Sequence, residues 1–241
     1  MKAKRMATNI TRLRGMLKKH KLVADETLWI MNEAAAHVGS CPPEEWAILI
    51  TPDRPVKFVR TETDDRLRPD VFCNIKATTH GTLPLSHLRL VLRVWSGTQD
   101  ISFRSDWDSN RIREEFRRTG SFNRVMFRCH YDNCSPKQYA PIFHLHFGGD
   151  PTNGEHCWFP HFLELPRFPS PPIDLILACE LVVATFFPSA HRKLMQNGSW
   201  ISLIQESESF FLGEFYKTCK NYFDCTPSFS TLLDHLSSFM I

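Results

Sequence analysis

The sequence lacks most of the features that assign a protein to a class at once. It contains no GxGxxG or Walker loop, no HExxH and no GxSxG motif. Nucleotide-driven enzymes hold phosphates in glycine-rich loops, so the missing loops argue against an enzyme of that kind. There is also no internal repeat and no low-complexity tract. We therefore expect no nucleotide-binding loop and no repeat architecture.

Long hydrophobic runs are absent as well. The most apolar stretch, residues 173–187, contains Asp174 and Glu180 and is too short to cross a bilayer. The basic start of the chain resembles a signal peptide, but three further basic residues interrupt any apolar segment behind it. We therefore expect a cytoplasmic protein with no membrane segment. Its eight cysteines are then expected to be thiols or ligands rather than disulfides.

Acidic residues are missing from the first 24 positions, which carry eight Lys or Arg. Apolar residues recur there at helical spacing, at Met6, Ile10, Leu13 and Leu17. This pattern, with a second helix after Asp25, predicts a helical pair packed on the protein body. Because uncompensated cations attract phosphate, two alternatives are an arm that contacts nucleic acid or a partner protein and a helix on a membrane surface. The candidate contact residues are Arg5, Arg12, Arg14, Lys18, Lys19 and Lys21.

Hydrophobicity of period two begins near Val56 and predicts strands. They are expected at 71–77, 88–95, 101–104, 124–132 and 142–147. Short connections between successive strands favour an antiparallel meander. The expected helices are 108–118, an apolar helix at 170–187, and two more around 211–222 and 232–239. The predicted fold is thus α+β, with an N-terminal helical arm at 1–50 and a core domain at 51–241.

The strongest functional signal is the stretch from 129 to 161. It holds eight of the nineteen Cys and His residues of the chain. These side chains bind transition metals, carry protons near neutral pH and act as nucleophiles. The cluster therefore indicates a site without identifying its reaction.

Residues two apart on a strand point to one face, so His144 and His146 share a face. On the preceding strand Arg128, His130 and Asp132 share a face, and Cys129 takes the other. If the two strands form a hairpin, the hydrophobic pattern brings both polar faces together. One allowed register sets His130 opposite His144 and Arg128 opposite His146. His130, His144 and His146 could then bind one divalent metal, and zinc is the first candidate. Asp132 and Arg128 would lie behind these ligands and hold them in position.

The loop that follows adds Glu155, Cys157 and His161 as catalytic candidates. Glu155 could act as a base beside a metal-bound water, and Cys157 as a fourth ligand or as a nucleophile activated by an imidazole. Several alternatives stay open: structural histidines, a metal site, and a Cys-His site without metal. The cysteine and histidine spacings do not fit a zinc finger.

Three function classes follow, of which the third is a structural adaptor without chemistry. The first is a hydrolase that acts on protein or nucleic acid through this cluster. The second is a non-enzymatic subunit that binds nucleic acid or a partner protein through the basic arm and an Arg-rich surface at 104–128. Glu180, in the middle of the apolar helix, is expected to pair with an Arg or His, because an unpaired buried carboxylate is unfavourable.

Overall fold

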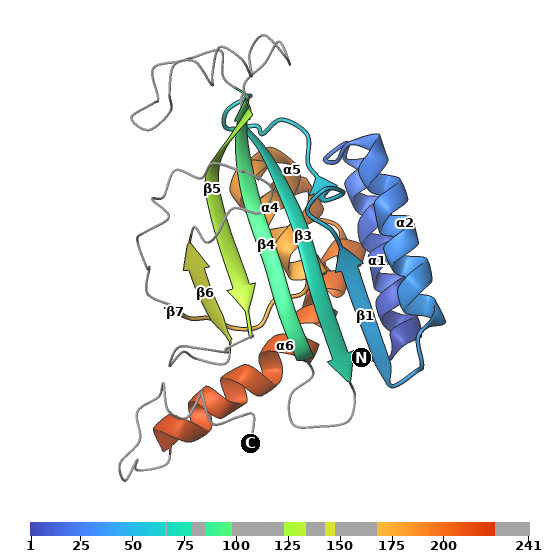
Figure 1. Ribbon diagram of the computed structural model, residues 1–241, viewed down its shortest axis with the longest axis vertical. Helices are drawn as coiled ribbons and strands as arrows, with labels where there is room; N and C mark the ends of the chain where they lie inside the picture. Colours follow the sequence, from blue (N-terminus) through green and yellow to red (C-terminus); the bar gives the residue numbers. More distant parts are fainter. Residues whose placement is uncertain (66, 79–84, 98–122, 134–142, 148–167, 225–241) are drawn as a thin grey trace.

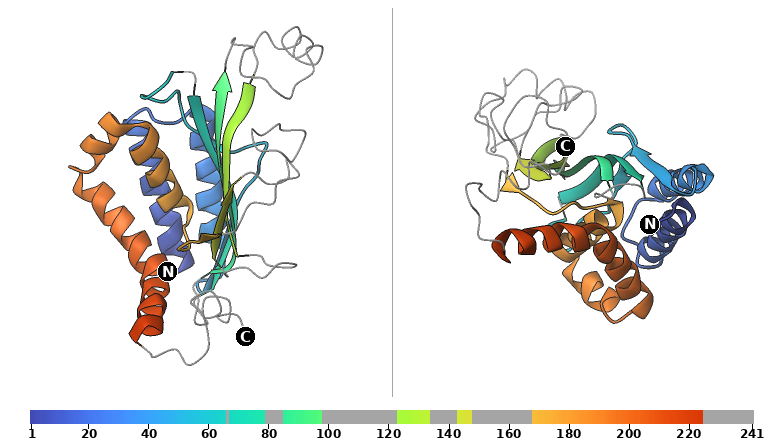
Figure 2. Two further views of the ribbon diagram at one scale, coloured as in Figure 1. Left: turned by 90° about the vertical axis from the view of Figure 1, so that its left-hand side faces the viewer. Right: turned by 90° about the horizontal axis from the view of Figure 1, so that it is seen from below.

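The computed structural model describes residues 1–65, 67–78, 85–97, 123–133, 143–147 and 168–224. At its centre is a seven-stranded sheet of order β1-β3-β4-β5-β6-β7, with β2 on the same edge of β3 as β1. All pairings among the described strands are antiparallel. Helices cover one face of the sheet (Figure 1, Figure 2). This architecture confirms the α+β class and the meander.

The strands agree with the period-two pattern where it was strongest. They are β1 (Glu45–Ile50), β2 (Val56–Lys57), β3 (Leu67–Thr78), β4 (Leu85–Gly97), β5 (Asn123–Asp132), β6 (His144–Phe147) and β7 (Phe168–Pro169). The short edge strand β1 was not predicted. It and β2 lie one after the other along β3, and Pro52 and Pro55 stand in the break between them. Proline cannot donate to a β ladder, which explains why the edge is interrupted there.

The helices are α1 (Ala3–Lys19), α2 (Asp25–Ser40), α4 (Leu175–Phe186), α5 (Pro188–Leu194) and α6 (Gly198–Asp224). The predicted stripe of α1, from Met6 to Leu17, is fully buried. Lys21 ends this helix with a φ of 53°, a left-handed conformation that usually belongs to glycine. The chain then turns into α2, which runs beside α1 (Figure 1).

The apolar helix α4 begins at Leu175 rather than at Ser170. Asp174 is its N-cap, because the side chain accepts a hydrogen bond from the Leu177 amide at 2.9 Å. The helix ends at Phe186, and Pro188 starts the short helix α5, which the sequence did not predict. Proline at the first helical position is favourable because its missing N–H would have no partner there.

One continuous hydrophobic core joins the two helical groups to the sheet. It includes Leu13 of α1, Ile48 of β1, Leu90 of β4, Val182 of α4 and Trp200 of α6. Strand β1 belongs to the segment assigned above to the arm, yet it pairs with β3 along its whole length. Residues 1–50 thus share the core of the sheet. The division into an arm and a core domain at residue 50 stays a prediction.

The predicted strand at 101–104 and the predicted helices at 108–118 and 232–239 lie outside the described residues. Among the helices that are described, none has the length and hydrophobicity needed to cross a membrane.

Candidate functional site

A row of charged residues crosses the sheet on the face turned away from the helices. Asp70 of β3 is opposite Arg93 of β4, which is opposite Arg128 of β5. The other face of β3 carries Cys73, which lies close enough to Cys179 of α4 for the two thiols to interact electrostatically. All three residues are at least 95% buried. Buried charges are unfavourable unless they are paired, so a row of three buried charged residues is unusual for this face of the sheet.

Arg93 and Asp70 form a bidentate ion pair. Arg93 Nε donates to Asp70 Oδ1 at 2.8 Å, and Nη2 donates to Oδ2 at 2.9 Å and to the Pro52 carbonyl at 3.0 Å. The indole Nε1 of Trp95 donates to Asp70 Oδ2 at 2.7 Å. The guanidinium carbon lies 4.7 Å from the Phe72 ring centre and 5.1 Å from that of Trp95. Burial raises the pKa of Asp70, and the Arg93 and Trp95 hydrogen bonds oppose that rise.

A pocket of about 730 Å³ opens beside this network. It lies where the break between β1 and β2 meets β3 and the end of β4. Its wall includes Lys57, Phe58, Arg60, Arg68, Arg93 and Trp95. Ligand sites in proteins are usually clefts of about 300–1,000 Å³ that combine apolar walls with a few polar groups. The pocket therefore has the size and the lining of a small-molecule or nucleotide-sized site.

The basic residues of the pocket differ in how they are engaged. Lys57 Nζ lies 2.8 Å from Glu26 Oε1, and Arg93 is held by Asp70. Arg60 and Arg68 are exposed and have no hydrogen-bond or ion-pair partner in the part of the chain that the structure describes. These two guanidinium groups are therefore available to an anion.

The histidine cluster is only partly described. β5 and β6 pair so that His130 is opposite His146 and Asp132 is opposite His144. The faces agree with the prediction, but the register is shifted by two residues from the one considered above. His130 is 4% exposed and Arg128 2%. In the described part of the chain, no group of three or more His, Cys, Asp or Glu side chains is arranged to hold a metal ion.

Several candidates lie where the structure gives no side chain. The side chains of His144 and His146 are outside the described part, although their backbone positions are inside it. Glu155, Cys157 and His161 lie wholly outside the described residues. Their roles remain predictions.

The described buried cysteines are poor nucleophiles. Cys73, Cys129 and Cys179 are buried free thiols. Burial raises the pKa of all three, to about 12 for Cys129, so the reactive thiolate is disfavoured. Cys129 also lies on the face opposite to His130, as expected from the alternation of the strand.

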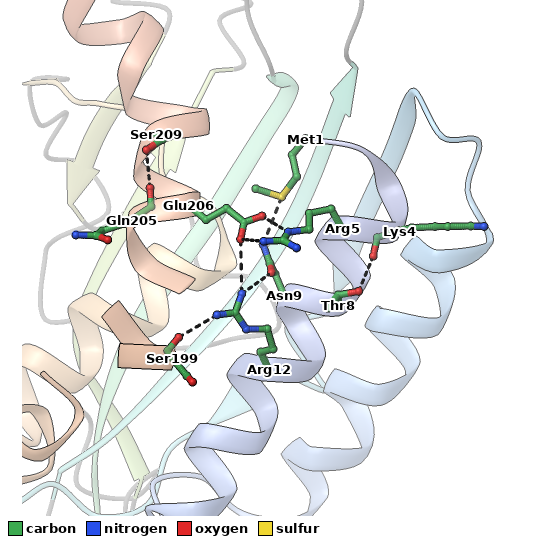
Figure 3. A network of polar contacts seen from close by, with 10 residues as sticks. All are labelled: Met1, Lys4, Arg5, Thr8, Asn9, Arg12, Ser199, Gln205, Glu206 and Ser209. Carbon is green, nitrogen blue, oxygen red and sulfur yellow. Dashed lines mark hydrogen bonds and ion pairs between the residues drawn. The ribbon is translucent and has the colours of Figure 1, made fainter. Parts of the chain in front are cut away.

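The six candidate contact residues in and just after α1 separate into two groups. Arg5 and Arg12 both form ion pairs with Glu206 of α6, and Arg12 also donates to the Ser199 carbonyl at 3.0 Å (Figure 3). Arg14 Nε donates to the Leu28 carbonyl at 3.0 Å. These three arginines dock α1 within the protein. The second group, Lys18, Lys19 and Lys21, is exposed.

Glu180 has the kind of partner expected for it, since its Oε1 lies 2.9 Å from His191 Nε2 of α5. Asp70, Arg93 and Trp95 were missed. The spacing of Arg93 and Trp95 places them on one face of a strand, which was a usable signal. Their partner Asp70 could be found only from the register between β3 and β4.

No protein-family model, no curated protein and no solved structure matches this chain.

Proposed function

We propose that the protein is a hydrolase that acts on a macromolecular substrate, with its reaction on the polar face of β5 and β6. The register of these two strands supports the proposal, because it sets His130 opposite His146 and Asp132 opposite His144. Opposite Cβ atoms in an antiparallel pair lie about 4.5–5.5 Å apart, and positions two apart on a strand share a face. Four residues of ligand type thus occupy neighbouring positions on one face.

Imidazole nitrogen and carboxylate oxygen together suit a divalent transition metal, and zinc is the first candidate. His130, His144 and His146 would hold the metal and leave a position for water. A bound metal ion supplies Lewis acidity and lowers the pKa of that water. Asp132 would orient one of the imidazoles. Glu155 would serve as the base.

The test measures the metal content of the purified protein and of three single variants by inductively coupled plasma mass spectrometry. His144→Ala and His146→Ala should each lose the metal that the parent protein carries. His37→Ala is the matched control, because His37 is exposed on α2, far along the chain from the cluster. A parent protein without metal, or equal metal in all four proteins, rejects the metal site. Cleavage of labelled casein and of labelled RNA by the same proteins identifies the substrate class.

A second candidate function is binding of nucleic acid without chemistry. It is favoured by the exposed cations at the end of α1, where partial burial lowers the pKa of His20 and the charges of Lys19 and Lys193 lower it further. Deleting residues 1–24 is not a usable test, because the stripe of α1 belongs to the core. Lys18→Glu/Lys19→Glu should weaken salt-sensitive RNA binding, whereas Lys2→Glu/Lys4→Glu at the other end of α1 should not. Equal effects of the two pairs reject this candidate.

A further inference from the structure

The pocket beside Asp70 and Arg93 is lined by none of the histidine-cluster residues. We propose that it binds a nucleotide unit, with the phosphate held by Arg60 and Arg68 and the base stacked on Trp95. The inference goes beyond the proposed hydrolase function and holds whether or not the face of β5 and β6 performs chemistry.

The phosphate end of the proposal rests on the two available guanidinium groups. Arg68 extends from β3, and Arg60 lies in the segment after β2, so the two approach the pocket from different parts of the chain. The planar fork of an arginine matches phosphate oxygens in a bidentate manner. Of the acidic residues that line the pocket, Glu26 is engaged by Lys57 and Asp70 by Arg93. The remaining acid, Asp53, is exposed.

The base end rests on Trp95, which is directly opposite Arg68 in the pairing of β4 with β3. Residues opposite each other in an antiparallel pair share a face, so the two side chains start from neighbouring positions on one face. The Asp70 carboxylate accepts the indole N–H at 2.7 Å, and the Arg93 guanidinium packs on the ring. A ring that is already held loses little conformational freedom when a base stacks on it.

Together these features specify a ligand with a phosphate and a planar ring at neighbouring positions. Inorganic phosphate offers no ring for Trp95, and an acidic peptide offers carboxylates but no base. A nucleotide offers both. It could come as a free mononucleotide or as part of a single strand, and both sources present the same chemistry.

The experiment measures binding by the full chain in the presence of EDTA, so that metal bound by the histidine cluster does not contribute. A fluorescein-labelled ten-nucleotide single strand is followed by anisotropy, with AMP, inorganic phosphate and polyglutamate as competitors. Arg60→Gln/Arg68→Gln should weaken binding at least tenfold. It should also reduce the slope of log K against log salt by about 0.7, because the two arginines hold one phosphate and each phosphate contact on a single strand contributes about 0.7.

Arg192→Gln is the matched control, because Arg192 is exposed on α5 and does not line this pocket. It should change affinity less than twofold. Trp95→Phe keeps an aromatic ring but removes the N–H that anchors it, and we expect a loss of about threefold to tenfold. Competition by AMP at a concentration that phosphate cannot match identifies a mononucleotide site, and competition by longer strands alone identifies a single-strand site.

The proposal is overturned by no binding of the strand or of AMP by the parent protein, by unchanged binding in Arg60→Gln/Arg68→Gln, or by an equal loss in Arg192→Gln. Displacement by polyglutamate as effective as displacement by AMP would also overturn it, since the site would then recognise acidic protein. Circular dichroism confirms that each variant is folded. Because EDTA removes metal from the binding assay, failure of this proposal says nothing about the metal site of the histidine cluster, which is tested separately.

Discussion

Replacing Asp174 by Asn should make the stability of the protein less dependent on pH. Asp174 is completely buried at the start of α4. Burial raises its pKa from 3.8 to about 6, although the Leu177 amide and the Ser207 hydroxyl, whose oxygen lies 2.7 Å from Asp174 Oδ2, favour the charged form. Asn keeps the N-cap function, because its side-chain oxygen can accept the same amide hydrogen bond.

The size and the sign of the effect follow from this pKa. The folded state holds the Asp174 proton more tightly than the unfolded state does. The resulting stabilisation is fully present below about pH 4 and is lost as the pH rises through 6. One pKa unit corresponds to about 1.4 kcal/mol, so a shift of roughly two units corresponds to about 3 kcal/mol over the whole range. About 2 kcal/mol of this falls between pH 4.5 and 7.5.

The assay is urea unfolding of the parent protein and of Asp174→Asn at both pH values. The unfolding free energy of the variant minus that of the parent should increase by about 2 kcal/mol from pH 4.5 to 7.5. Asp53→Asn is the control, because Asp53 is exposed, and its difference should not change with pH. Ser207→Ala should lower the unfolding free energy more at pH 7.5 than at pH 4.5, because at pH 7.5 the Ser207 hydroxyl donates to a charged carboxylate. A difference for Asp174→Asn that is the same at both pH values would refute the reasoning.

Three further substitutions, with Glu208→Gln as a control, test the packing and charge arguments by urea or thermal unfolding. Lys21→Gly should stabilise the protein by about 0.5–1 kcal/mol, because glycine adopts the positive φ at the end of α1 without strain; a less stable variant would contradict this. Glu206→Gln should destabilise it by about 1 kcal/mol at pH 7 and by progressively less as the pH falls into the acid range, since the Arg5 hydrogen bond lowers the pKa of Glu206 and this stabilisation is lost on protonation. Glu208→Gln on the same helix is the control and should have no effect at pH 7. Arg93→Met should lower stability by about 3 kcal/mol or more, because it leaves Asp70 buried without its ion pair, and a loss below 1 kcal/mol would count against a buried pair.

The parts of the fold that were predicted from the sequence are those in which many residues follow the same hydrophobic periodicity. Four apolar positions specify the buried face of α1, and all four are buried. β4 and β5 were recognised because their alternation extends over a whole strand. β1 and α5 are short, with β1 between prolines and α5 starting at Pro188, so their patterns contain too few positions to indicate a period.

The register between β5 and β6 shows a different limit. Hydrophobic alternation has a period of two residues, so it fixes which face a side chain takes but not which residue it meets. A shift by two preserves every face, and the observed pairing of His130 with His146 differs from the considered one in that way. The Asp70–Arg93 pair was missed for the same reason. A charge within a strand looks like a solvent-facing position until the strand beside it is placed.

The docking of α1 on α6 has a consequence for synthesis of the chain. Arg5 and its partner Glu206 are 201 positions apart, and Arg12 and Ser199 are 187 apart. At about 5–20 residues per second, a ribosome needs roughly 10–40 s to add that many residues. During this time the apolar stripe of α1 lacks α6, which belongs to the same core. A chaperone that binds α1 before α6 is synthesised can therefore protect this stripe from aggregation.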